Sequence, residues 1–215
     1  MPPILWKAAH FHTKMDQSTS EFYDRYAGGG MQNEAAKSAV SAHFGRAFRA
    51  GGKVLDVGAG SARDLVVLLG MGFDAYGLEP NDTMRATALR KHAELAGRLQ
   101  AGALPALDIP FGGGFDGILC SAVLMHVPSS DLPRCAESFR ALLNPKGRLL
   151  LSLPFMRADL LDGKRDPDGR FFENHGMTDV ARDLEQAGFA LVESRDGGEY
   201  AGTRWFILLF ALSAR

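Results

Sequence analysis

The sequence predicts an α/β protein whose core is a doubly wound, mostly parallel sheet of seven strands. Three observations predict it. From residue 52 onward, short runs rich in leucine or β-branched residues alternate with helix-length segments. A glycine-containing turn directly follows the first run. No helix-length segment separates the last two runs, so we expect the last strand to be antiparallel to its neighbour.

The strands are expected over residues 53–57, 74–79, 98–101, 115–121, 147–153, 189–195 and 203–212. The helices between them are expected over residues 62–71, 82–95, 130–143 and 178–187. Gly72, Gly188 and the pair Asn144-Pro145 each follow a periodic segment and are typical helix ends. Thr178 is the expected cap of the last helix. The segment DGGEYAG, residues 196–202, is typical of a hairpin connection.

Residues 1–50 precede the sheet and are expected to form a helical lid segment, with residues 51–215 as the main part of a single domain. Helices are expected over residues 18–27 and 33–49, joined by the glycines of residues 28–30. The connection after the fifth strand, MRADLLDGKRDPDGRFFENHG, is longer than a simple turn requires. Such connections often determine substrate specificity.

The composition argues against several classes of partner. The 24 basic residues nearly balance the 25 acidic ones, so nucleic acid and acidic membrane surfaces are not expected partners. Cys120 and Cys135 are too few for a disulfide framework and lack metal-ligand spacing. The first residues do not resemble a secretory signal, and the apolar run at residues 205–214 is too short to span a membrane. We therefore expect a cytoplasmic protein that needs no metal.

The segment VLDVGAGSARD, residues 54–64, carries the strongest functional signal. Gly58, Ala59 and Gly60 follow the first strand and let a ligand approach the backbone. Nicotinamide dinucleotide binding is one alternative, but Arg63 occupies the place of the third glycine in that fingerprint. Asp56, just before the turn, would repel a pyrophosphate and suits a cationic ligand better. A tight turn with no ligand is the other alternative.

These residues resemble the first motif of the class I S-adenosylmethionine-dependent methyltransferases, a Rossmann-like family whose sheet also ends in an antiparallel hairpin. The resemblance covers most of the chain from residue 53 onward. It implies that Glu79, beside Pro80 in AYGLEP, binds both ribose hydroxyls of S-adenosylmethionine. It also implies that Asp108 accepts from the adenine amino group while Ile109 packs on the ring. The segment SAVLMHV, residues 121–127, also resembles the family, and the resemblance implies that Cys120, directly before it, borders the cofactor.

Methyl transfer from a sulfonium requires mainly close approach and exclusion of water, so few catalytic side chains are obligatory. His126, just after the fourth strand, is a candidate general base, and a loop-capping histidine is an equal alternative. His175, with Glu173 nearby, is the second candidate, and a cap before the last helix is its competing role.

Three further residues are candidates for contact with ligand. Tyr26, three residues after Tyr23 on a predicted helix, could cover the cofactor or simply pack. Phe172 could form an apolar wall for substrate or anchor its loop in the core. Arg204 could hold an anionic group of the substrate or form a surface ion pair.

The sequence therefore predicts a methyltransferase that acts on a small molecule. The alternatives are a non-catalytic cofactor-binding module, a nucleic-acid methyltransferase and a nicotinamide-dependent oxidoreductase.

Overall fold

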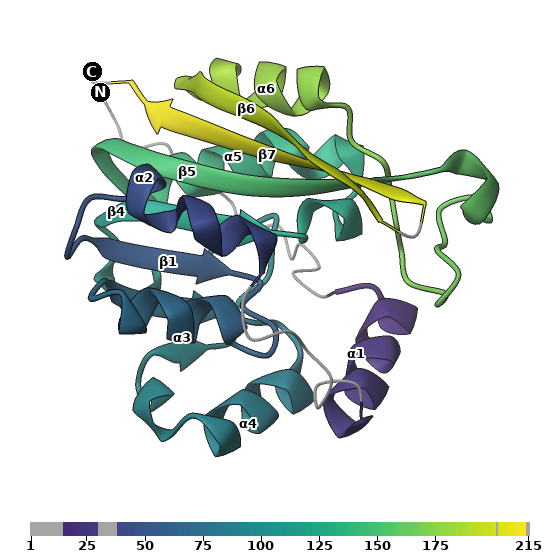
Figure 1. Ribbon diagram of the computed structural model, residues 1–215, viewed down its shortest axis with the longest axis horizontal. Helices are drawn as coiled ribbons and strands as arrows, with labels where there is room; N and C mark the ends of the chain where they lie inside the picture. Colours follow the sequence, from purple (N-terminus) through teal and green to yellow (C-terminus); the bar gives the residue numbers. More distant parts are fainter. Residues whose placement is uncertain (1–14, 30–37, 201, 214–215) are drawn as a thin grey trace, which may run out of the picture.

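The computed structural model describes residues 15–29, 38–200 and 202–213, and its centre is one seven-stranded sheet (Figure 1). The strand order is β3-β2-β1-β4-β5-β7-β6. β1, β2, β3, β4 and β5 pair in parallel, and β7 pairs antiparallel with both β5 and β6. The predicted fold class, including the reversed last strand, is confirmed.

The strands at the centre of the sheet are nearly continuous hydrophobic runs, as expected for parallel strands covered on both faces. Their bounds are β1 Lys53–Val57, β2 Asp74–Leu78, β3 Leu99–Gln100, β4 Phe115–Ser121, β5 Leu143–Met156, β6 Phe189–Tyr200 and β7 Thr203–Leu212. The order reverses between β1 and β4, which lie side by side at the centre. In open α/β sheets this switch point is where ligands bind, at the carboxyl ends of the strands.

Helices cover both faces of the sheet (Figure 1). One face packs against α5 (Leu132–Leu142) and α6 (Met177–Gln186), around a cluster that includes Phe139, Leu184 and Phe210. The other face packs against α2 (Phe44–Ala47) and α3 (Arg63–Gly70), with Phe44, Phe48 and Leu65 in its core. The helix α4 (Asp82–Lys91) and the short turn Ala93–Leu95 complete this layer.

Several boundaries differ from the sequence prediction. β5 begins four residues early, because Leu143 already pairs with Phe115 across an irregularity in the ladder, and it ends later than expected. β3 is only two residues long. The helix expected over residues 82–95 ends at Lys91. α6 begins at Met177 with Gly176 as its N-cap, so Thr178 does not cap it.

The amino-terminal region divides into two parts with different roles. α1 (Gln17–Gly29) lies at the carboxyl-terminal edge of the sheet, near α4 (Figure 1). Residues 38–48 instead pack on the sheet, with Val40 and Phe44 almost fully buried. Within the described residues, the predicted helix over 33–49 is a 3-10 turn, Ala39–His43, followed by α2. Residues 1–14 and 30–37 of the expected lid segment lie outside the described residues.

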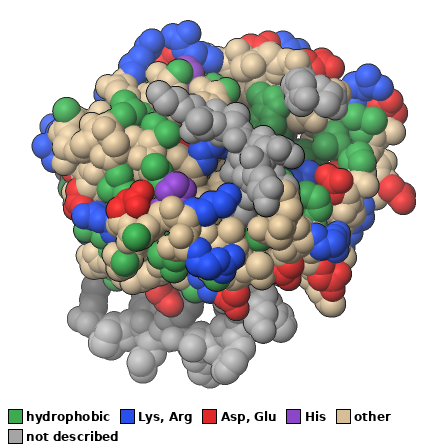
Figure 2. Space-filling view, turned by 60° about the horizontal axis from the view of Figure 1, so that its bottom comes forward, with side chains coloured by type: hydrophobic (Ala, Val, Ile, Leu, Met, Phe, Trp, Pro, Cys, Tyr) green, Lys and Arg blue, Asp and Glu red, His purple; other side chains and the backbone are tan. Residues whose placement is uncertain are grey.

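The surface carries no large patch of one charge on the face that Figure 2 shows, where acidic and basic side chains are interspersed. This distribution agrees with the near balance of charges in the sequence. Among the described residues, no helix combines the length and the apolar character needed to cross a bilayer.

Candidate functional site

The turn after β1 brings the backbone of residues 58–60 close to the end of β2 and to Val123. Gly58 and Gly60 have φ angles of +74° and +57°, which glycine adopts at little cost. The N–H groups of Gly58 and Ala59 donate to the carbonyl of Leu78 on β2, at 2.8 and 2.9 Å. A Cβ at position 58 would lie only 2.4 Å from Cγ2 of Val123. Position 58 therefore requires glycine for both conformation and space.

Glu79 follows β2 and faces the glycine turn. Its side chain is 5% exposed, and its two carboxylate oxygens accept from the backbone N–H groups of Gly60 and Asn81, each at 2.8 Å. Burial raises the pKa of Glu79, while the two N–H donors oppose that rise. The carboxylate is thus fixed at the carboxyl end of β2, with further lone pairs available for hydroxyl donors.

Asp56 is the most unusual polar group near the turn. It is 3% exposed, and its Oδ2 atom has no hydrogen-bond partner. Burial raises its pKa well above the ordinary value, and the nearby carboxylates Asp64 and Glu79 add to the rise. A buried acceptor without a partner is costly. A cationic or hydrogen-bond-donating ligand beside Asp56 would relieve that cost.

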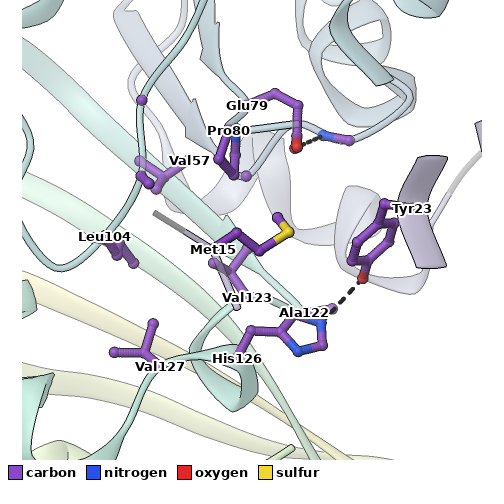
Figure 3. Close-up of a pocket in the computed structure, with 14 residues that line it drawn as sticks. Met15, Tyr23, Val57, Glu79, Pro80, Leu104, Ala122, Val123, His126 and Val127 are labelled. Carbon is purple, nitrogen blue, oxygen red and sulfur yellow. Dashed lines mark hydrogen bonds between the residues drawn. The ribbon is translucent and has the colours of Figure 1, made fainter. Parts of the chain in front are cut away.

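A cavity opens between the glycine turn, Glu79 and α1, and we call it the central cavity (Figure 3). Its volume is about 100 Å³, and it is open to solvent. Its walls come from the ends of β1 and β2, the segment after β3, the segment after β4, and α1. The lining residues are Met15, Tyr23, Val57, Gly58, Gly60, Glu79, Pro80, Gly102, Ala103, Leu104, Ala122, Val123, His126 and Val127.

Two further recesses adjoin the central cavity. The charged recess lies on the other side of the glycine turn and is lined by Asp56, Tyr26 and Arg170 among others. The outer recess shares Met15, Pro80, Gly102 and Ala103 with the central cavity, and its rim includes Asp108 and Ile109. Ile109 is 71% exposed. The central cavity also shares Tyr23, Gly58, Gly60 and Ala122 with the charged recess, so the three adjoin one another around the turn.

His126 lies at the wall of the central cavity, in the short turn Leu124–His126 after β4. Its Nδ1 atom is 2.6 Å from the carbonyl oxygen of Phe171, and its Nε2 atom is 3.1 Å from the hydroxyl of Tyr23 (Figure 3). Burial lowers the pKa of His126 to about 4. The ring is therefore neutral near pH 7, with Nε2 directed toward Tyr23.

α1 is held over the cavity from two sides. On one side, Nδ2 of Asn81 donates to the carbonyl of Ser20 at 3.2 Å and to Asp24 at 2.9 Å. On the other side, Arg165 forms a two-pronged ion pair with Asp16, at 2.6 and 3.0 Å. The connection between β5 and α6, residues 157–176, thus helps to position the helix that covers the site.

His175, a predicted catalytic residue, has a structural position instead. It is 5% exposed, and its Nε2 atom lies 2.9 and 3.0 Å from the carbonyl oxygens of Leu124 and Val127. Both partners are acceptors, so Nε2 must carry a proton and donate. His175 does not line the described cavities, and it braces the turn that carries His126.

Three other predicted contacts are not at the cavity. Cys120 is 1% exposed and packs in the core with Cys135, whereas its neighbour Ser121 lines the charged recess, as alternation along a strand dictates. Phe172 is 3% exposed and packs in the core against Met125. Arg204 is exposed and ion-paired with Asp196 across the β6–β7 hairpin.

Two of the other predicted site residues, Asp108 and Ile109, lie at the outer recess. The remaining eight meet around the turn: Asp56, Gly58, Ala59, Gly60, Glu79, Pro80, Tyr26 and His126. Sequence reasoning missed three residues that the fold brings there. Met15 and Arg170 carry no local sequence signal of this role. Asn81 does carry one, because asparagine before a helix is a common N-cap, and its Oδ1 accepts from Met84 N–H at 2.8 Å.

Comparisons with known proteins agree with this geometry. A family model described as a methyltransferase domain matches residues 29–194. An uncharacterised methyltransferase of Staphylococcus carnosus is 26% identical over 149 residues, covering 69% of this chain and 68% of that protein.

Two solved structures are similar in fold. One is 1,6-didemethyltoxoflavin-N1-methyltransferase of Burkholderia thailandensis, with its substrate and S-adenosylhomocysteine bound. It has a TM-score of 0.71 and 22% identity, with 91% of this chain and 88% of that chain covered. The other is the cyclase SpnF, with a TM-score of 0.71, 16% identity and coverage of 94% and 97%. Since a cyclase shares the fold, the fold alone does not determine the reaction.

Proposed function

Because the chain belongs to the methyltransferase domain family and is a class I S-adenosylmethionine-dependent methyltransferase, we propose that it methylates a small-molecule acceptor within the central cavity. The observation that carries the proposal is the enclosure of His126 and the glycine turn beneath α1. The cavity is walled by α1 together with the segments after β3 and β4, which favours a small molecule over a nucleic-acid strand or a folded protein.

The residues around the turn fit the cofactor. The unpartnered oxygen of Asp56 and the charged recess suit the amino-acid end of S-adenosylmethionine, beside Tyr26. Glu79 offers lone pairs to the ribose hydroxyls, with Pro80 beside it. Gly58, Ala59 and Gly60 let the cofactor approach the backbone. Asp108 and Ile109, on the rim of the outer recess, are the proposed adenine contacts.

When bound, the cofactor supplies a methyl group on a positively charged sulfur. The chain's own contributions are orientation and exclusion of water, to which the apolar walls at Leu104, Val123 and Val127 contribute. His126 is the proposed general base, since its neutral ring lies at the wall of the same cavity. We assign no ligand contact to His175, Cys120, Phe172 or Arg204.

Transfer of labelled methyl groups tests this proposal. The protein is supplied with S-adenosylmethionine carrying a labelled methyl group and with a cell extract separated by size into small molecules, nucleic acids and proteins. We expect label to enter only the small-molecule fraction. Label in nucleic acid or protein would contradict the assignment of acceptor class, and no transfer alongside firm cofactor binding would favour a non-catalytic binding module.

A further inference from the structure

Tyr23 and His126 meet at the wall of the central cavity, with the Tyr23 hydroxyl 3.1 Å from Nε2 of His126 (Figure 3). Resting on the proposed function, we propose that these two residues act as one proton-accepting pair. Tyr23 contacts the acceptor, and His126 takes the proton that Tyr23 gives up. We infer further that the acceptor is an O–H or N–H of phenol-like acidity on a conjugated ring.

The direction of both hydrogen bonds follows from Phe171. Its carbonyl oxygen can only accept, so the Nδ1 atom of His126, at 2.6 Å, must carry the ring proton. The Nε2 atom of the neutral ring then has a free lone pair. The Tyr23 hydroxyl, 3.1 Å away, must therefore donate to Nε2. The Tyr23 oxygen also accepts a hydrogen bond from Arg170, and its remaining lone pair can accept a proton from a third group.

The structure favours a relay over direct attack by His126 on the acceptor proton. Tyr23 already occupies the lone pair of Nε2, so an acceptor could reach His126 only if α1 moved away. The peptide group of Phe171 opposes that movement, because its N–H donates to Oγ1 of Thr19 at 2.8 Å while its carbonyl holds His126. Thr19 and Tyr23 are four residues apart and share one face of α1. One peptide group thus positions both members of the pair.

Burial and the charged groups nearby together determine the pKa values of the two residues. Arg170 and Glu79 act on Tyr23, and Asp166 and Asp16 act on His126 together with Arg170. Burial dominates both residues: it raises the pKa of Tyr23 and lowers the pKa of His126 to about 4. Such a weak base gives little driving force against an aliphatic alcohol. An acceptor with acidity near that of a phenol, whose pKa is about 10, matches it far better.

The atoms and charges balance without another reactant. The acceptor lone pair forms the bond to the methyl carbon, and the carbon–sulfur bond breaks with its electron pair left on sulfur. The acceptor proton passes to the Tyr23 oxygen as the Tyr23 proton passes to Nε2 of His126. One positive charge disappears from sulfur and one appears on imidazole, so the net charge in the cavity is unchanged. The imidazolium then releases its proton to water.

The cavity walls agree with a neutral ring as acceptor. Gly58, Gly60, Glu79 and Pro80 of the central cavity are the proposed cofactor contacts. Apart from Tyr23 and His126, the other lining residues in the described part of the chain are apolar or glycine. Arg170 lies in the charged recess, where its guanidinium stacks over Phe22 and pairs with Asp166. Within the described residues no cationic side chain lines the central cavity itself, and a carboxylate acceptor would need no base.

Nuclear magnetic resonance of ¹⁵N-histidine-labelled protein tests the pair without turnover. With S-adenosylhomocysteine present, we expect His126 to carry its proton on Nδ1. Tyr23→Phe keeps the ring but removes the donor that stabilises neutral imidazole, so the pKa of His126 should rise. Tyr76→Phe, which removes a hydroxyl outside the site, should leave it unchanged. A His126 titration unaffected by Tyr23→Phe would overturn the pair.

Methyl transfer to probe acceptors tests the chemistry. A panel of substituted phenols and azoles, with cyclohexanol as the aliphatic comparison, is incubated with S-adenosylmethionine, and S-adenosylhomocysteine release is measured. We expect transfer to the conjugated acids and none to cyclohexanol. Tyr23→Phe should lower kcat about 100-fold with the KM for S-adenosylmethionine unchanged. Tyr23→Phe combined with His126→Gln should be no slower than either alone, because paired groups are not additive.

Transfer to cyclohexanol at a comparable rate, no transfer to any conjugated acid, or additive losses in the double variant would each overturn this inference. Calorimetric titration with S-adenosylhomocysteine separates its failure from that of the proposed function. If the wild-type protein binds the cofactor product but fails these tests, only the pair or its acceptor class is wrong. If it does not bind, the function proposed for the site is wrong as well.

Discussion

At the scale of single residues, Gly58 is the position where backbone conformation and space act together. Gly58→Ala places a Cβ 2.4 Å from Val123 in a backbone conformation with φ of +74°. We expect a loss of about 2–4 kcal/mol in the free energy of unfolding from overpacking and strain, measured by urea denaturation. Gly60→Ala is the matched control, since its nearest neighbour is 3.6 Å away. Equal losses for both variants would show that the contact with Val123 is unimportant.

His126 makes stability depend on pH in a predictable direction. Its pKa in the folded protein is lowered by burial to about 4, from an ordinary value of 6.5. Between these values the unfolded chain binds more protons, so stability falls as pH falls through this window. When the pH falls from 6.5 to 4, we expect the free energy of unfolding of His126→Gln to decrease by roughly 2–3 kcal/mol less than that of the wild type. Denaturation curves at both pH values measure the difference. Equal decreases in the free energy of unfolding for wild type and His126→Gln would contradict a neutral His126 in the folded protein.

At the scale of secondary-structure elements, Asn81 joins α4 to α1. It caps α4 through Met84 N–H and ties α1 through Ser20 and Asp24. Asn81→Ala should lower the free energy of unfolding by about 1–2 kcal/mol, mostly because α4 loses its N-cap. Asn81→Ser keeps a capping oxygen, so we expect it to restore stability but not the ties to α1. Hydrogen exchange should therefore speed up in α1 for both variants. Protection of α1 that remained at the wild-type level would refute the tie.

The elements that the sequence predicted well are those with local signals. The strand, glycine turn and acidic residue around Gly58 and Glu79 could be predicted because residues 53–79 carry β1, α3 and β2 in order. β5 could not be bounded, because Asn144-Pro145 is a typical break and yet the ladder with β4 continues past it. The end of a strand depends on its partner, which local sequence does not specify.

The polar contacts of the site were harder to predict, because distant segments supply them. Tyr23 and His126 are 103 residues apart, and only the completed fold brings them together. The local sequence contains no signal for the role of Phe171, whose backbone rather than its side chain holds His126. The family resemblance implied that Cys120 borders the cofactor, but strand alternation directs its side chain into the core.

At the scale of the whole molecule, ligand binding should stabilise the fold as a unit. The site joins both halves of the sheet, α1 and the connection at residues 157–176, so cofactor bound there favours the folded state. At 100 times its Kd, S-adenosylhomocysteine should add about 2.7 kcal/mol, equivalent to a rise in Tm of about 5–10 °C for a chain of this size. Differential scanning calorimetry measures the shift. NAD at the same concentration should give none.

The central claim is that Glu79 and the glycine turn hold the S-adenosyl cofactor, and calorimetric titration tests it most directly. Wild-type protein should bind S-adenosylhomocysteine at one site. Glu79→Gln removes a charged hydrogen-bond acceptor, so its Kd should rise about 10-fold to 100-fold, with the fold retained in circular dichroism. Absence of wild-type binding, or an equal Kd for Glu79→Gln, would contradict the account.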